Sequence, residues 1–168
     1  MDQNRIEIAE RQLDRVLQFA SRIESKVSML LATNLGIFAV LLTNLSYSDI
    51  NTWYIASPLA VGLLMISQSI FYLYKATYPR LEGGSSSLVF FSEIANRTEH
   101  NYQKEFLNIS LEDLYSDLAG QIWRNSQIMK SKFYCVNRAF FWTFSSIVPS
   151  VIFLFASSVT HGRTILVN

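Results

Sequence analysis

The chain has 168 residues, half of them hydrophobic, and a positive mean hydropathy of +0.21. Its 14 lysines and arginines nearly balance its 13 aspartates and glutamates, so the overall charge gives no reason to expect nucleic-acid binding. The length suits one domain, and the hydropathy argues against an ordinary soluble globule.

The first 27 residues, 1–27, are predicted to form an amphipathic helix. Apolar side chains from Ile6 to Val27 recur at spacings of three and four residues, or at their sum, while acids and arginines take the other faces. No helix-breaking residue separates this stretch from the uncharged sequence that follows it. We therefore expect the helix to continue without interruption into the next segment.

Three windows of the sequence contain no charged residue, and each is long enough to supply the roughly 20 residues that a helix needs to cross a bilayer. A buried core helix is also apolar, but three such helices are too many to bury in a globule of this size. We therefore predict transmembrane helices at residues 28–46, 53–74 and 140–159.

A few uncharged polar side chains fall inside these predicted spans. A polar group in hydrocarbon is costly unless it is hydrogen-bonded, so we expect these residues to hold helices together; the alternative is that they line a water path. No acid or base lies within a span, which argues against a proton-coupled transporter. The polar residues are Asn34, Gln68, Ser145, Ser146 and Ser150.

The longest hydrophilic part of the chain, residues 75–138, lies between the second and third spans. Ser110 and the acids after it mark a helix start, and an apolar stripe then predicts one long helix over residues 111–137 that leads into the last span. The glycine–serine tract at 82–87 is predicted to be a flexible linker rather than a phosphate-binding loop, because no lysine follows it.

The distribution of lysine and arginine predicts the orientation in the membrane. Five of these residues lie in 1–26, eight in 75–138 and one in the tail, whereas the link between the first two spans has none. The positive-inside rule then places the N-terminal helix and segment 75–138 in the cytoplasm and the tail, 160–168, outside. The expected fold class is an all-α membrane protein: three transmembrane helices with a cytoplasmic helical module formed by extensions of the spans.

The soluble parts are short, and the usual motifs of enzymes are missing from the sequence. Because the two cytoplasmic stretches are too small for a substantial core, we expect a homo-oligomer to supply buried surface. The chain has one cysteine and two histidines, and it shows no metal-ligand pattern, Walker loop or nucleophile elbow. We therefore expect no metal, no cofactor and no enzymatic activity.

Three stretches of sequence stand out when they are taken together with the spans. The first, FASRIESKVSMLLATNLGIFAVLL at residues 19–42, leads a charged helix into the first span. The second is YPRL followed by SLVFFSEIA, between Tyr78 and Ala95, and the third is DLAGQIWRNSQIMKSKFYCVNRAF at residues 117–140. In this order they resemble the Pycsar effector family of bacterial transmembrane anti-phage proteins, over roughly residues 12–160.

The resemblance implies a multi-pass sensor in the bacterial inner membrane, with its N-terminus in the cytoplasm and its C-terminus outside. Such a protein is expected to bind a cyclic pyrimidine mononucleotide, cCMP or cUMP, made by a separate cyclase on phage infection. It then impairs the inner membrane, and the infected cell stops growing or dies. The residues alone leave two alternatives open: a ligand-independent membrane scaffold and a small pore-forming, holin-like protein.

A site for such a nucleotide needs a cation for the phosphate, an aromatic ring for the base and polar groups for the base edge. Segment 75–138 offers all three, and the YPRL stretch is therefore expected to be a recognition element as well as a connector. The candidate cations are Arg80, Arg97, Arg124 and Lys132; the aromatics are Tyr78, Phe91, Tyr102 and Trp123; the edge readers are Ser92, Glu93, Gln121 and Asn125.

Overall fold

The computed structural model describes residues 2–78 and 86–162, with the side chains of 4–78, 86–160 and 162. Within these residues all regular structure is helical. The helices are α1 (Asp2–Asn44), α2 (Tyr47–Ile50), α3 (Trp53–Thr77), α4 (Phe91–Ala95), α5 (Glu99–Asn108) and α6 (Leu111–His161). The chain divides into two compact units: unit 1 comprises Met1–Ile23 and Tyr78–Lys132, and unit 2 comprises Glu24–Thr77 and Phe133–Asn168.

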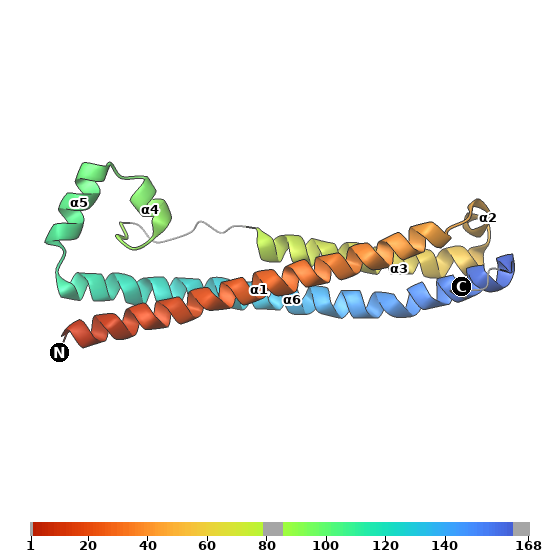
Figure 1. The fold of residues 1–168 in the computed structure, drawn as a ribbon, viewed down its shortest axis with the longest axis horizontal. Coiled ribbons are helices and arrows are strands. Elements are labelled where there is room, and N and C mark those ends of the chain that lie inside the picture. Colours follow the sequence, from red (N-terminus) through yellow and green to blue (C-terminus); the bar gives the residue numbers. More distant parts are fainter. Residues whose placement is uncertain (1, 79–85, 163–168) are drawn as a thin grey trace, which may run out of the picture. The chain divides into compact units, whose positions relative to one another are not determined.

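Three helices, α1, α3 and α6, are long and apolar enough to cross a membrane. The predicted all-α membrane protein with three transmembrane helices is confirmed. The N-terminal amphipathic helix and the first span form the single helix α1, as expected from the absence of a helix breaker between them. The stretches at 111–137 and 140–159 likewise form one helix, α6 (Figure 1).

A seven-residue repeat explains why α1 keeps one buried side along its whole length. Its buried residues Ala9, Val16, Ile23 and Leu30 are spaced by seven, and a second row, four residues further along, ends at the buried Leu41. Alternating steps of three and four keep one stripe against a partner, as in a coiled coil. Because unit 1 ends at residue 23 on this helix, the repeat passes from unit 1 into unit 2 without a break.

The buried side of α6 follows the same spacing. Buried or half-buried residues are separated by alternating steps of four and three, and they occupy positions 118, 122, 125, 129, 132, 136, 139, 143, 146, 150, 153 and 157. The heptad spacing therefore runs along α6 from unit 1 into unit 2.

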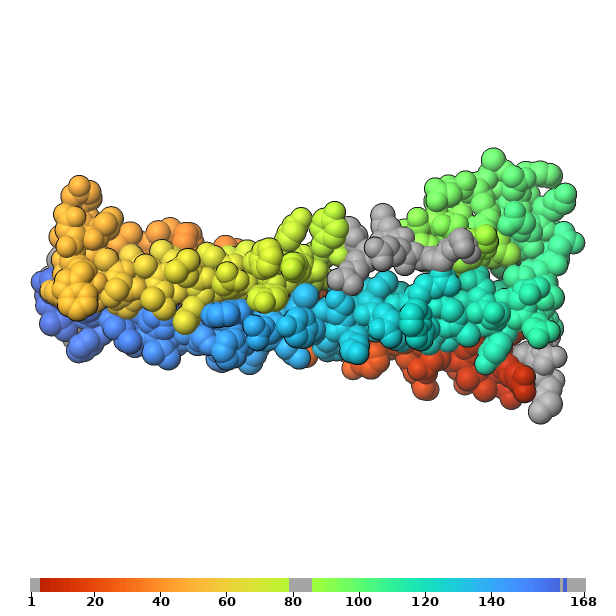
Figure 2. Space-filling view, turned by 180° about the vertical axis from the view of Figure 1, so that it is seen from behind, coloured from red at the N-terminus to blue at the C-terminus, as the bar shows by residue number. Residues whose placement is uncertain are grey.

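Unit 2 is a three-helix bundle in which α3 packs on α1 and α6. Figure 2 shows α3, in yellow, along α6, in blue. Its apolar core consists of Leu41 from α1, Ile55, Leu59 and Ile66 from α3, and Phe153 from α6. The link between α1 and α3 contains the single turn α2, which begins after Ser46 with a capping box formed by Ser46 and Asp49.

Unit 2 exposes large apolar side chains on its outer surface and buries polar side chains in its interior. Phe140, Phe144 and Phe155 on α6 are more than half exposed, whereas Thr143 and Ser146 on the same helix are fully buried. In water this arrangement would be unfavourable, because the large apolar side chains would face solvent. In a bilayer it is the expected one, with apolar side chains toward the lipid and polar side chains between helices.

Unit 1 contains the first part of α1, the first part of α6 and the short helices α4 and α5. The segment from Ser86 through α5 packs on α6, where it is drawn in green against cyan (Figure 2). α5 begins at the cap Thr98, whose hydroxyl accepts a hydrogen bond from the Asn101 amide. α6 begins at Ser110, whose hydroxyl accepts from the Asp113 amide.

Candidate functional site

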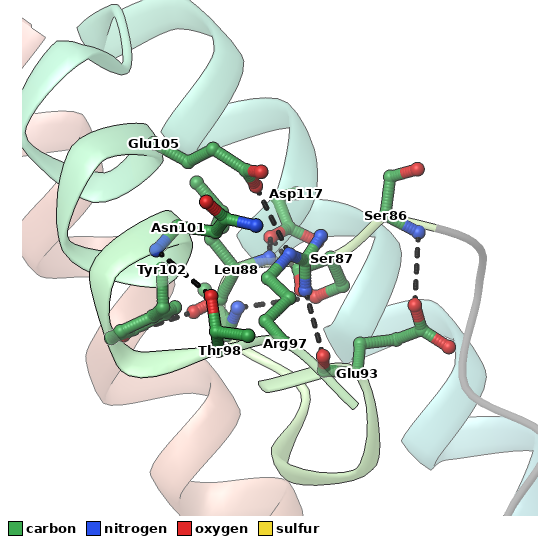
Figure 3. A network of polar contacts seen from close by, with 11 residues as sticks. Ser86, Ser87, Leu88, Glu93, Arg97, Thr98, Asn101, Tyr102, Glu105 and Asp117 are labelled. Atoms are coloured by element: carbon green, nitrogen blue, oxygen red, sulfur yellow. Dashed lines mark hydrogen bonds and ion pairs between the residues drawn. The ribbon is translucent and has the colours of Figure 1, made fainter. Parts of the chain in front are cut away.

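The polar centre of unit 1 is a set of contacts around Ser87, which we call the Ser87 cluster. It consists of Ser87, Leu88, Arg97 and Asp117, which are labelled in Figure 3, and of Gln121. The Ser87 hydroxyl donates to Asp117 Oδ2 at 3.0 Å and accepts from Gln121 Nε2 at 3.0 Å. The Leu88 amide donates to the same Asp117 oxygen at 2.8 Å. Asp117 and Gln121 are one helical turn apart on α6, so they present both groups to the irregular segment before α4.

The Ser87 hydroxyl also organises the start of α4. It accepts hydrogen bonds from the amides of Val89 and Phe90 at 3.2 and 3.0 Å. Ser87 is 4% exposed, and its hydroxyl supplies a hydrogen-bond acceptor to both amides at the start of α4. The prediction of a flexible glycine–serine linker is therefore wrong at Ser87, although residues 82–85 of that tract lie outside the described residues. Its neighbour Ser86 adopts a left-handed backbone conformation with φ of 70°.

Arg97 closes the corner between α4 and α5. Its Nη1 donates to the carbonyl oxygens of Ser87 at 2.8 Å and Glu93 at 2.9 Å, and its Nε donates to Glu105 at 3.0 Å. The side chain is 15% exposed. The Glu93 carboxylate accepts from the Ser86 amide at 3.3 Å, and the Tyr102 hydroxyl donates to the Leu88 carbonyl at 3.4 Å. These groups stabilise the 86–108 segment by bonds within the protein.

The structure thus brings together some residues that the sequence analysis selected for a ligand. Arg97 and Gln121 belong to the Ser87 cluster, and Glu93 and Tyr102 contact it. Ser92, next to Glu93 on α4, is half-buried. Their polar groups are already hydrogen-bonded, so a ligand would have to displace an internal bond to reach most of them. The cluster is well suited to hold a fold together and poorly suited to accept a nucleotide in this conformation.

The remaining candidates of segment 75–138 are spread along unit 1. Phe91 and Trp123 are exposed, at 64% and 65%. Arg124 donates through Nε to the Gly120 carbonyl at 3.2 Å, and Asn125 donates to the Gln121 carbonyl at 2.9 Å, so both fold back on α6. Lys132 is half-buried at the end of the unit, and Tyr78 is exposed after α3. Arg80 lies outside the described residues.

Unit 2 has its own polar centre, the Asn34 triad, formed by Asn34 of α1, Ser69 of α3 and Thr143 of α6. Asn34 Nδ2 donates to Ser69 Oγ at 3.0 Å and to Thr143 Oγ1 at 3.1 Å, and the two hydroxyl oxygens lie 2.8 Å apart. All three residues are fully buried. One side chain from each of the three long helices therefore meets at one level of the bundle.

The other polar residues selected in the spans behave differently from Asn34. Ser146 and Ser150 are buried, but their hydroxyls donate to carbonyls of α6 itself, those of Thr143 and Ser146, at 2.7 Å each. Ser145 is half-buried, and Gln68 lies on the exposed face of α3. A hydroxyl bonded to its own helix needs no partner on a neighbouring helix.

Asp49 is an important residue that the sequence analysis did not select. It is the one charged side chain between Lys26 and Lys75, and it is fully buried. Its carboxylate accepts from the Ser46 amide at 2.9 Å and from the Ser157 hydroxyl on α6 at 3.1 Å. A serine followed three residues later by an acid is a sequence signal for this cap, but the bond to Ser157 requires the tertiary structure.

Asp117 and Ser87 also escaped selection. Asp117 lies beside Leu114, Leu118 and Gln121, which belong to the inward side of α6. An acid on such a stripe signals that a specific partner is needed, because burial of an unpaired charge is costly. Ser87 carried no comparable signal, since it ends a tract whose composition is typical of linkers.

Comparison with known proteins adds information about relatives. The family model described as "Pycsar effector protein domain" matches residues 8–158. The chain is 24% identical over 102 residues to "Pycsar effector protein GmPycTM" of Gulbenkiania mobilis, with 56% of this chain and 52% of that protein covered. The chain therefore spans about half the length of the curated relative that it matches. No solved structure matches.

Proposed function

The chain belongs to the Pycsar effector family, and on this basis we propose that it is an anti-phage defence effector that senses a cyclic pyrimidine nucleotide, cCMP or cUMP. In this proposal the nucleotide comes from a separate cyclase and binds unit 1 in the cytoplasm. The bound effector then impairs the bacterial inner membrane through unit 2, and the infected cell stops growing or dies. The chain itself recognises a ligand and carries out no catalytic step.

The observation that carries the proposal is the continuity of two helices. α1 and α6 each begin in unit 1 and end in unit 2, and neither is interrupted where the units divide. A ligand shifts a protein between conformers only by binding one of them more tightly. A ligand that favours one arrangement of these helices in unit 1 therefore has a direct covalent route to the helices of unit 2.

The charge distribution supports the proposed orientation. The arginines and lysines gather in unit 1 and at its borders, whereas unit 2 presents Phe and Leu side chains on its outer faces. By the positive-inside rule unit 1 faces the cytoplasm, which is where a soluble nucleotide would be made. The C-terminus then lies outside.

Exposed apolar side chains on unit 1 support self-association. Ile8, Leu17 and Phe19 on α1 are 60%, 47% and 44% exposed, and Leu107 on α5 is 82% exposed. Large apolar groups on a cytoplasmic surface are often covered by a partner. In the proposal that partner is a further copy of the chain.

Dye release from liposomes tests the proposal directly. Purified full-length protein would be reconstituted with an enclosed fluorescent dye, and cCMP or cUMP would be added, with linear CMP and UMP as controls. We expect release only with a cyclic pyrimidine nucleotide. Release without nucleotide would indicate a holin-like pore. No release with any nucleotide would indicate a ligand-independent scaffold. Either result would contradict the proposal.

A further inference from the structure

Unit 1 contains a cavity at the start of α6 that is separate from the Ser87 cluster. It has a volume of about 360 Å³ and is lined by Arg5 of α1 together with Leu111, Glu112 and Tyr115 of α6. Small-molecule sites in proteins commonly have volumes of about 300 to 1,000 Å³. Arg5 belongs to α1, outside segment 75–138, so this combination of residues is not apparent from that segment alone.

The functional groups that line this cavity are uncommitted. Among the described side chains, the Arg5 guanidinium, the Glu112 carboxylate and the Tyr115 hydroxyl take part in no hydrogen bond or ion pair. Arg97 and Gln121, by contrast, are bonded within the Ser87 cluster. A ligand that enters the cavity therefore meets available groups, whereas a ligand at the cluster would have to break internal bonds.

The three groups match the three parts of a nucleotide. A guanidinium binds a phosphate through paired, charge-assisted hydrogen bonds. The face of a tyrosine ring stacks on a base, and Tyr115 is 42% exposed, so its ring is accessible. A carboxylate accepts hydrogen bonds only, so Glu112 requires a donor such as a ribose hydroxyl or an exocyclic amine.

We propose that this cavity is the binding site for the cyclic mononucleotide, with Arg5 on the phosphate, Tyr115 against the base and Glu112 on a ribose or base donor. The assignment rests on the proposed function, because that function supplies the ligand. Glu112 repels an anion, which orients the ligand so that the phosphate lies on the Arg5 side. Because Arg5 belongs to α1 and the other residues to α6, the nucleotide would join the two helices that continue into unit 2.

Binding measurements on the full-length protein in nanodiscs test the site. Titration calorimetry with cCMP and cUMP would compare the wild type with Arg5→Gln and Tyr115→Leu. We expect each substitution to weaken binding about ten-fold or more, as for loss of a charged hydrogen bond or a stacked ring. Arg5→Lys should recover part of the affinity and Tyr115→Phe most of it, because charge and ring are retained.

Matched controls make the result specific. Arg15→Gln removes an exposed arginine from the same helix, and Trp123→Leu removes an exposed aromatic that the sequence analysis selected. Both are expected to bind like the wild type. Far-UV circular dichroism of each variant checks that the helices are intact, and inorganic phosphate and phosphatidylglycerol nanodiscs check whether any anion or lipid headgroup occupies the site.

The outcomes separate this inference from the proposed function. If the wild type binds neither nucleotide, the proposed function fails. If the wild type binds but Arg5→Gln and Tyr115→Leu bind equally well, only the site assignment fails. Competition by inorganic phosphate or phosphatidylglycerol at nucleotide concentrations would also overturn the assignment, because the cavity would then be a general anion site.

Discussion

The Ser87 cluster holds an irregular segment on a helix by charged side chains, whereas the Asn34 triad joins three helices by neutral ones. In unit 1 an irregular segment must be held on α6, and two charged side chains, Asp117 and Arg97, bind its backbone amides and carbonyls. In unit 2 the backbones are helical and already satisfied, so neutral side chains suffice to join them. Charged side chains thus bind the backbone where it lacks partners and water is near, whereas neutral side chains join the helices where lipid surrounds the bundle.

Removal of Asp117 should have the largest effect. Asp117→Ala leaves the Leu88 amide without its acceptor and removes the acceptor of the Ser87 hydroxyl, at a cost of about 3 kcal/mol for bonds to a charged group. Hydrogen exchange by mass spectrometry should show loss of protection over residues 86–95. Asp14→Ala, at an exposed site on α1, is the control. Unchanged protection at Leu88 would show that the cluster does not hold the segment.

Substitution of two glycines tests how closely the helices of unit 2 pack. A Cβ atom at Gly62 would lie 3.3 Å from Ser150 Oγ, whereas a Cβ at Gly36 would meet no atom within 4 Å. Gly62→Val should therefore destabilise the bundle by about 2 kcal/mol through overpacking, and Gly36→Val should cost far less. Thermal unfolding in detergent measures both. Equal losses for the two variants would mean that α3 and α6 are not closely packed at this level.

The Asn34 triad should contribute less than the Ser87 cluster. Asn34→Leu removes the amide but leaves Ser69 and Thr143 bonded to each other and to the Ala139 carbonyl, so we expect a loss of about 1 kcal/mol. The matched control is Gln68→Leu, which removes an amide from the exposed face of α3 and should be neutral or stabilising in lipid. A loss as large as that of Asp117→Ala would erase the contrast between the two units.

The smallest effect is expected at the rim of the Ser87 cluster. Glu105 is 50% exposed where it pairs with Arg97, and an ion pair in contact with solvent is worth about 0.5 kcal/mol. Glu105→Gln should hardly change the free energy of unfolding, and high salt should reproduce its effect in the wild type. Chemical denaturation at two salt concentrations provides the measurement. A loss of unfolding free energy larger than that of Asn34→Leu would mean that Arg97 holds the corner between α4 and α5 mainly through Glu105 and not through the two carbonyls that it binds.

Much of the fold was predictable because it depends on local patterns. The uncharged windows and the spacing of apolar residues identify α1, α3 and α6, and the serine at 110 marks the start of α6. The 86–108 segment was not predictable in the same way, because Ser87 gains its partners only from Asp117 and Gln121, some 30 residues away. Composition alone made the tract at 82–87, which ends at Ser87, resemble a linker.

The candidate site was less predictable than the fold. Residue types suited to a nucleotide were recognised in segment 75–138, but their availability depends on which of them the fold already uses. For the same reason Asn34 was recognised as a contact between helices, whereas its partners Ser69 and Thr143 were not. Those partners depend on the register of three helices, which periodicity within one helix does not determine.

The bond between Asp49 and Ser157 has a consequence for how the protein assembles during synthesis. In the proposed orientation, with the N-terminus in the cytoplasm, α1 and α3 would insert as a hairpin whose tip carries the Asp49 carboxylate to the far side of the bilayer. The Ser46 amide is available to that carboxylate at once, but Ser157 belongs to the last helix to leave the ribosome. In that orientation, insertion of α6 would add the Ser157 hydrogen bond to the tip, and the hairpin would gain this bond only after α6 has entered the membrane.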